Sequence, residues 1–330
     1  MFVAFSCFSC RSCCSFSFLC APWRGKNGHA RERLLTGGTV AFGANYAAMV
    51  RVSAVDPGLL ELARTVEKTD YCFTTITPES HRRVNARHGN DEALDLRDVF
   101  GWSRRFDPAI LPEGLFALMQ AAGAVVADGE RWRSCVRLST IGDLLFVHSA
   151  FPTEAGDAVF FGPDTYRFVA AMRQEIACGT LPLWRRAVDL GCGSGAAGIV
   201  LARDNPEGSV VLTDINPAAL RFAAINAALA KVANVAVHQA NLLDGVDGEL
   251  DLVVANPPYL LDPAKRLYRH GGGARGEGLS LAIVDAALAR LTPGGTLLLY
   301  TGTAIVGGLD PFREAVAVRL AGSGHSWRYR

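Results

Sequence analysis

Residues 188–198 read VDLGCGSGAAG, an apolar run that leads into four closely spaced glycines. The glycines at positions 191, 193, 195 and 198 let the chain turn sharply and let a ligand approach the backbone. The next helix begins there, and its first amides are free to face that ligand. The stretch therefore predicts a buried strand, a ligand-binding turn and a helix.

The same turn bears on the kind of ligand. The spacing Gly193-x-Gly195-x-x-Gly198 alone fits the fingerprint of dinucleotide-binding proteins. However, Asp189 precedes the first glycine by two residues and puts a carboxylate inside the loop. A carboxylate repels a pyrophosphate but suits a ligand with an ammonium group, so a nicotinamide cofactor is disfavoured.

From about residue 160, short apolar runs alternate with helical stretches. The runs are RAVDL, SVVLTDI, NVAVHQA, LDLVVAN and GTLLLYT. This βαβ repetition predicts an α/β fold with a doubly wound, mostly parallel sheet. Ligands of such sheets bind beyond the carboxyl ends of the strands, at the point where the strand order reverses.

Two of these strands end in residues that suit a nucleoside. Asp214 in TDINPAAL lies about twenty residues past the glycine turn, where an acid can accept hydrogen bonds from both ribose hydroxyls. Asn241 and Leu242 in ANLLD follow the next strand and are placed to face an adenine ring. With Asp189, these residues predict a nucleoside that carries a cationic amino-acid tail and no phosphates.

A rigid loop follows the fourth strand, in VVANPPYLLD at residues 253–262. Pro257 and Pro258 supply no backbone donors and fix two φ angles. Asn256 precedes a proline and is pushed into an extended conformation. A buried strand therefore ends in a donor-poor loop at the edge where ligands bind.

The motifs VDLGCGSG, TDIN, ANLLD and NPPY, in this order and spacing, resemble those of the class I S-adenosylmethionine-dependent methyltransferases. The small-domain (MTS) group, which includes the release factor glutamine methyltransferases and several RNA N-methyltransferases, is the most similar. The resemblance covers roughly residues 158–321. It implies a Rossmann-like methyltransferase sheet, S-adenosylmethionine as the cofactor, and no metal.

The resemblance also implies roles for individual residues. These are Asp189, Gly191, Gly193 and Gly195 at the methionine part, Asp214 and Ile215 at the ribose, Asn241 and Leu242 at the adenine, and Asn256, Pro257, Pro258 and Tyr259 at the acceptor nitrogen, with Asn256 counted in the cofactor site as well.

This assignment gives the NPPY loop a chemical purpose. An amide or exocyclic amine nitrogen is a poor nucleophile, because its lone pair is delocalised. The side-chain oxygen of Asn256 and the carbonyl of Pro257 can accept from its two N–H groups, and Tyr259 can stack on the planar group. The prolines keep the acceptors rigid, and alignment of the reactants can supply about 7–11 kcal/mol.

Residues 56–157 predict a small accessory α+β module, for which a winged-helix arrangement is one form. The elements expected are helices from Asp56-Pro57 through LLELARTVEK, from Thr77 to His88 and over 113–125, then strands in 130–140 and 143–151 around the Ile141-Gly142 turn.

Two arginine groups in this module leave two interpretations open. Arg131, Arg133 and Arg137 share one face of the ribbon by period 2, and a second group lies on the preceding helix at Arg82, Arg83 and Arg87. One interpretation is nucleic acid binding through phosphate contacts. The other, which we favour, is an ordinary solvated face.

Two further segments also carry alternatives. In FFGPDTYRF (160–168), Pro163, Asp164 and Arg167 either contact the cofactor or substrate, or belong to a linker turn in which Asp164 caps a helix. The glycine-rich YRHGGGARGEGLS (268–280) is either a mobile loop over the acceptor site or a solvent loop.

Residues 1–55 are rich in Ser, Cys and Phe and poor in acids, which predicts a disordered tail, a transit peptide, or a start annotated ahead of Met49. The expected location is accordingly the cytoplasm, or a mitochondrion or plastid. The five cysteines of this stretch are not expected to bind metal, and the absence of an eighteen-residue apolar run predicts no membrane span.

The methyltransferase domain is expected over residues 158–330, with one departure from its relatives. The chain stops at HSWRYR, where a sixth strand would run, so the closing C-terminal hairpin is expected to be missing. This predicts either a truncated chain or an incomplete sheet edge.

The function predicted from the sequence is transfer of a methyl group to a planar nitrogen of a macromolecule, either a protein such as a release factor or an RNA. A protein glutamine is slightly favoured, because the chain outside residues 1–55 has a net charge of −4. The alternatives are methylation of a base in rRNA or tRNA, and a catalytically inactive cofactor-binding subunit. A small activating subunit is a further expected partner.

Overall fold

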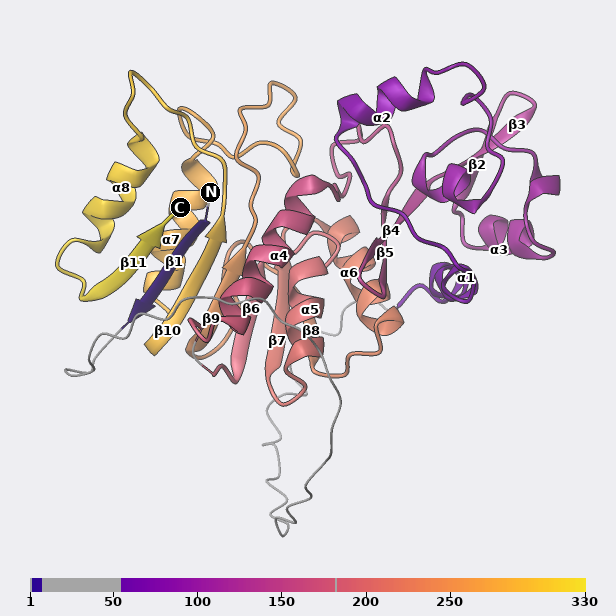
Figure 1. The fold of residues 1–330 in the computed structure, drawn as a ribbon. Helices are drawn as coiled ribbons and strands as arrows, with labels where there is room; N and C mark the ends of the chain where they lie inside the picture. Colours follow the sequence, from indigo (N-terminus) through magenta and orange to yellow (C-terminus); the bar gives the residue numbers. More distant parts are fainter. Residues whose placement is uncertain (1, 8–54, 182) are drawn as a thin grey trace, which may run out of the picture.

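The computed structural model describes residues 2–7, 55–181 and 183–330. Its centre is a sheet of seven strands (Figure 1). In spatial order these are β11 (His325–Tyr329), β1 (Phe2–Cys7), β10 (Leu291–Tyr300), β9 (Leu250–Ala255), β6 (Arg186–Leu190), β7 (Ser209–Asp214) and β8 (Val235–Gln239). The run from β10 to β8 is parallel, so the predicted doubly wound α/β sheet is confirmed.

The edge of the sheet differs from the prediction. His325–Tyr329 forms a strand, and β1 lies antiparallel between it and β10. The expectation of an incomplete edge was therefore wrong, because the amino-terminal segment supplies the missing backbone partners of both strands. Phe2–Cys7 was expected to belong to a disordered tail, but it forms a strand of the sheet. The transit-peptide, start-site and cysteine interpretations concern residues 1–55, of which 1 and 8–54 lie outside the described residues.

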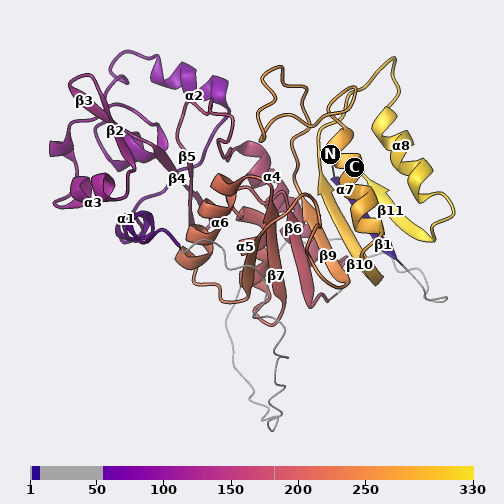
Figure 2. The ribbon, with the colours of Figure 1, turned by 180° about the vertical axis from the view of Figure 1, so that it is seen from behind.

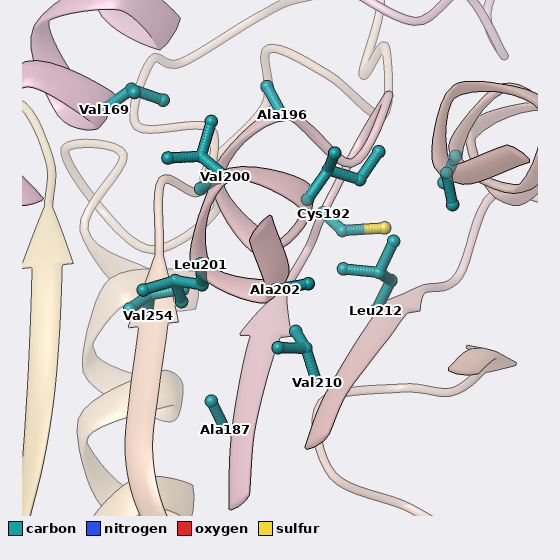
Figure 3. Packing of buried hydrophobic residues seen from close by; sticks show 14 of the residues in the cluster. Val169, Ala187, Cys192, Ala196, Val200, Leu201, Ala202, Val210, Leu212 and Val254 are labelled. Carbon is teal, nitrogen blue, oxygen red and sulfur yellow. The ribbon is translucent and has the colours of Figure 1, made fainter. Parts of the chain in front are cut away.

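Helices cover both faces of the sheet (Figures 1 and 2). One face carries α4 (Pro163–Ala177), α5 (Ala196–Asp204) and α6 (Pro217–Leu229), and the other carries α7 (Gly278–Leu288) and α8 (Pro311–Leu320). Successive strand residues alternate between the two cores, as Ala187 and Val188 do in β6. Figure 3 shows the first core, where Val200 and Leu201 of α5 pack with strand residues such as Val254.

The amino-terminal module has the predicted α+β composition. Its elements are α1 (Pro57–Glu67), α2 (Pro78–Asn85), a π-helix (Arg97–Gly101), a 3-10 helix (Pro108–Ile110), α3 (Leu115–Ala121) and the hairpins β2–β3 (Val125–Asp128, Arg131–Ser134) and β4–β5 (Val136–Ile141, Leu144–Ser149). The predicted starts at Asp56 and Thr77 are confirmed, since both side chains cap their helices.

Two expected elements of the module have other bounds. The helix predicted over 113–125 ends at Ala121, because Gly123 adopts a left-handed φ of 59° and Val125 opens β2. The strand predicted over 130–140 is divided at Cys135 into β3 and β4, which pair with different partners.

The module is tied to the sheet through α6. Its core continues into residues of that helix, among them Phe222 and Ile225. The buried Asn226 side chain accepts from the Val147 amide at 2.7 Å and donates to the Val147 carbonyl and to the Ser194 carbonyl, both at 2.9 Å. One side chain therefore joins β5 of the module to the glycine turn.

Candidate functional site

A cavity of about 520 Å³ lies at the carboxyl ends of the parallel strands. Its walls include the glycine turn after β6, the end of β7, the segment after β8 and the NPPY loop after β9. The volume falls within the range usual for cofactor and small-molecule sites. The strand order reverses between β6 and β9, so the cavity lies where such sheets bind their ligands.

The glycines of the turn have different structural roles. Gly191 and Gly193 line the cavity, with left-handed φ values of 69° and 55°. Gly195 is not in the lining; it precedes α5 with a φ of 81°. A Cβ atom at Gly198 would lie 2.1 Å from Leu212, so this glycine lets α5 pack closely against β7.

Asp214 ends β7 and holds the glycine turn. One carboxylate oxygen accepts from the Gly193 amide and the other from the Asn216 amide, both at 2.9 Å. Asp214 also lines the cavity, together with Ile215, Asn241 and Leu242. Burial raises the pKa of the Asp214 carboxyl group. Each carboxylate oxygen keeps a lone pair with which it can accept from a bound ligand.

Asp189 does not line the cavity. Its carboxylate is 3 % exposed and accepts from the Gly198 amide at 2.8 Å. This side chain was expected to contact an ammonium group, but it is not part of the cavity wall. Burial, together with the nearby Asp214 carboxylate, raises the pKa of Asp189 to about 7.

The NPPY loop is part of the same cavity. Asn256, Pro257, Pro258 and Tyr259 all line it. Ala255 at the end of β9 pairs in register with Leu190 at the end of β6, so the two loops begin side by side. Within the described part of the chain, no hydrogen bond engages the Asn256 side chain or the Pro257 carbonyl, which leaves both oxygens available to a ligand.

Several further residues line the cavity, and the sequence analysis did not assign them to the cofactor or acceptor site by residue. They come from α2 (Pro78, Arg82), from the segment after β5 (Phe151 to Glu154) and from the loop after NPPY (Arg266 to Arg269). Their only sequence signals were the arginines of the second helix and the glycine-rich stretch after residue 268.

The first part of the loop after NPPY, at Arg266 to Arg269, lies at the cavity wall and contacts the segment after β5. The Tyr268 hydroxyl donates to the Thr153 carbonyl at 2.6 Å, and its ring stacks on Phe160 with centroids 5.7 Å apart. The Leu267 amide donates to the Gly156 carbonyl at 3.3 Å. Of the two interpretations of 268–280, the solvent loop is therefore wrong for Tyr268.

The three arginines of the ribbon do not form a free basic face. Arg131 is paired with Glu92 and Asp107, and Arg133 with Asp128. Arg137 is 3 % exposed, so the predicted shared face is wrong for this residue. Its guanidinium donates to a backbone carbonyl, and burial lowers its pKa to about 10.

Metal and membrane sites can be judged only for part of the chain. Residues 2–7, 55–181 and 183–330 contain no cluster of three or more His, Cys, Asp or Glu side chains with metal-binding geometry. No helix within these ranges combines the length and the apolar character needed to cross a bilayer.

Replacement of Asp189 by Asn tests the buried charge. The pKa of about 7 means that the folded chain must carry a buried carboxylate above this pH, whereas the unfolded chain ionises near pH 3.9. This group therefore lowers the free energy of unfolding as the pH rises from roughly 4 to 7. Asn keeps an acceptor for the Gly198 amide without the charge.

The measured quantity is the Tm of Asp189→Asn minus the Tm of the wild type. We expect this difference to be larger at pH 8 than at pH 5, by roughly 2–4 °C for each kcal/mol of burial cost that the substitution relieves. Calorimetry without ligand measures it. Asp251→Asn is the control, since its half-buried carboxylate also accepts backbone amides. A Tm difference that is the same at both pH values would contradict the assignment.

Comparison with known proteins agrees with this geometry. Residues 175–305 match the family described as methyltransferase small domain (MTS). A release factor glutamine methyltransferase of Deinococcus radiodurans is 37 % identical over 127 residues, which cover 34 % of this chain and 44 % of that protein. The chain spans about half the length of several such relatives.

A relative from Cereibacter sphaeroides aligns over more of its length. This release factor glutamine methyltransferase is 36 % identical over 240 residues, which cover 66 % of this chain and 82 % of the relative. A solved ribosomal protein L11 methylase from Lactobacillus delbrueckii has a TM-score of 0.36 at 22 % identity, over 48 % of this chain and 69 % of that one, which is too weak to bear on fold or function. The chain belongs to the family of the release factor glutamine methyltransferases.

Proposed function

We propose that the chain is an S-adenosylmethionine-dependent N-methyltransferase that acts on a glutamine side chain of a protein release factor. The observation that carries the proposal is the pair of unengaged acceptors, the Asn256 side chain and the Pro257 carbonyl, in one cavity with the glycine turn. A primary amide has two N–H groups, and these two oxygens can accept them.

The chemistry of the cavity wall fits the proposed cofactor. Gly191 and Gly193 present backbone without side chains, and Asp214 presents carboxylate lone pairs for ribose hydroxyls. Ile215 and Leu242 supply apolar surface, and Asn241 supplies an amide for an adenine. When bound, S-adenosylmethionine supplies an electrophilic methyl group on a sulfonium.

The residues of this chain then align and polarise the acceptor. Acceptance of both N–H bonds by Asn256 and Pro257 fixes the nitrogen and favours electron density on it. The bond from nitrogen to the methyl group would form as the bond from that methyl group to the sulfonium sulfur breaks, which leaves the thioether, and the amide would lose one of its two N–H protons to solvent. The flanking prolines keep these oxygens in place, so little reorganisation accompanies the reaction. The hydrogen bond from Tyr268 to the Thr153 carbonyl holds the loop after NPPY at the cavity wall.

Two observations favour protein over nucleic acid as the acceptor. The named relatives are release factor enzymes. Of the arginines that suggested nucleic acid binding, Arg131 and Arg133 are held in ion pairs and Arg137 lies in the interior, whereas Arg87 is exposed and forms no ion pair within the described residues. Arg82 at the cavity is also paired, with Glu79. Methylation of a base in rRNA or tRNA is therefore the second candidate.

The finer parts of the proposal concern partner and location. We propose a small activating subunit, and a mitochondrial or plastid location that rests on the composition of residues 1–55. The proposed domain boundaries are 55/56 and 157/158. Amino-terminal sequencing of the protein from cells tests this location, because import into either organelle would remove a leader. Cleavage of a leader beyond Cys7 would also remove β1 from the sheet.

The direct test is transfer of labelled methyl from S-adenosylmethionine to a purified release factor. Mass spectrometry should find one added methyl group on a glutamine. A parallel reaction in cell extract is split between protease and ribonuclease. Label removed by ribonuclease alone would establish the base methyltransferase instead. Absence of label from every fraction, with S-adenosylhomocysteine bound, would establish that the isolated chain is inactive.

Asn256→Ala tests the acceptor site. We expect kcat to fall at least roughly 100-fold, because one of the two acceptors for the reacting nitrogen is lost. The affinity for S-adenosylhomocysteine should change little. Gln120→Ala, which removes an exposed amide on α3, is the control and should keep the wild-type rate. An unchanged kcat for Asn256→Ala would show that NPPY does not hold the acceptor.

Asp214→Ala tests the cofactor site. The loss of two hydrogen bonds to a carboxylate, each worth about 1.5–3 kcal/mol, should weaken binding of S-adenosylhomocysteine at least roughly 100-fold by calorimetry. Asp244→Ala removes an exposed carboxylate outside the cavity lining and should bind normally. Asp214→Asn keeps an acceptor for the Gly193 amide and separates lost ligand contacts from a disturbed turn. Binding by Asp214→Ala within threefold of the wild type contradicts the assignment.

A further inference from the structure

The side chain of Tyr259 is fixed at two points outside its own loop. Its hydroxyl donates to Oδ2 of Asp164 at 2.5 Å. Its ring closes against Gly302, just beyond β10, where an added Cβ atom would lie 2.3 Å from Cδ2 of the ring. The last residue of NPPY is therefore clamped between the first turn of α4 and the end of β10.

Asp164 does not cap α4, although its position at the start of the helix suggests that role. It is the second residue of α4, but the side chain that accepts an amide at the start of this helix is Thr165, whose hydroxyl accepts from the Gly162 amide at 3.3 Å. The carboxylate lines the cavity instead. A carboxylate in the first turn is favoured by the helix dipole, so it can be held there at little cost.

The other oxygen of Asp164 is also engaged. Oδ1 is 3.1 Å from the Arg167 guanidinium, and the Tyr300 hydroxyl lies at 3.5 Å, the long limit of a hydrogen bond. Arg167 is mostly exposed, whereas the Asp164 side chain is 29 % exposed. The carboxylate is thus oriented from one side by Arg167, which leaves Oδ2 directed to Tyr259. Both oxygens of Asp164 therefore accept hydrogen bonds from neighbouring side chains.

This clamp acts on the geometry that methyl transfer needs. The side-chain oxygen of Asn256 and the carbonyl of Pro257 belong to the loop that ends at Tyr259. The first end of the loop is fixed by β9, whose last residue is paired with β6 and with β10. The prolines stiffen the loop, but a stiff loop holds a position only if its second end is fixed as well.

We infer that Asp164 is a positioning residue for the acceptor loop: it holds the hydroxyl of Tyr259 and thereby sets where Asn256 and Pro257 meet the acceptor nitrogen. This inference rests on the proposed function for its effect on turnover, whereas the contact itself does not. Arg167 orients Asp164 and is the next member of the same chain of contacts.

A double-mutant cycle of Asp164→Ala and Tyr259→Phe tests the inference in the full chain. We expect each change to lower kcat by roughly 10- to 100-fold, since a displacement of about 1 Å has effects of this size. The double variant should be no slower than the slower single variant, because both changes remove one contact. The affinity for S-adenosylhomocysteine should stay within about twofold of the wild type, unlike that of a misfolded variant.

Tyr329→Phe is the matched control. It also removes a hydroxyl-to-carboxylate contact, to Asp310, and neither residue lines the cavity. Its kcat should equal that of the wild type. Asp164→Asn, which keeps an acceptor for the hydroxyl, should recover part of the rate and serves if Asp164→Ala does not fold. Rate losses that multiply in the double variant, or an unchanged rate in Asp164→Ala, would overturn the inference.

Thermal unfolding of the four proteins of the cycle, which are the wild type, the two single variants and the double variant, gives a readout that does not depend on activity. The Tm losses of Asp164→Ala and Tyr259→Phe should not add in the double variant. If the wild type transfers no methyl group but the Tm losses are coupled, the proposed function fails and the contact stands. If the Tm losses add in full, the clamp is absent and the inference fails whatever the activity of the chain.

Discussion

The parallel pairing of β6 with β9 is the constraint on which the site depends. Leu190 and Ala255 are register partners at the ends of these strands, so the glycine turn and NPPY begin at the same level. The chain reaches β9 only after it has run outward through β7 and β8, and it then crosses back to the other side of β6. Helices therefore leave on opposite faces of the sheet, and a cavity opens between the two loops.

The polar groups at this cavity divide into those that build it and those that remain for a ligand. Asp189 holds the amide of Gly198, and Asp214 holds the amides of Gly193 and Asn216. Asp189 is buried and Asp214 is half-buried, and desolvation raises the pKa values of both, so the turn is formed at a cost in unfolding free energy above neutral pH. A cationic ligand nearby reduces that cost, because it favours the ionised form. The turn thus couples the stability of the empty chain to its affinity for a cation.

Much of the fold and of this site follows from local sequence signals. The glycine turn, Asp214, Leu242 and NPPY come together because each directly follows a strand, and parallel strands bring their carboxyl ends to one edge. The position of β1 did not follow, because its pairing with β10 joins segments almost 300 residues apart and has no local signature. Arg137 was misplaced for a related reason. Period 2 holds within one strand, but the chain divides between Ser134 and Val136, and β4 turns this arginine inward.

The contact between Asp164 and Tyr259 lies at the boundary of what sequence can predict. Both residues stood in segments singled out for function, yet Asp164 was equally expected to cap a helix. The distinction depends on where α4 begins relative to β9, which is set by packing of the whole sheet. The same packing brings α2 and the segment after β5 to the cavity, through Asn226 and the core shared with α6. The module therefore supplies part of the wall of the cavity that the NPPY loop also lines.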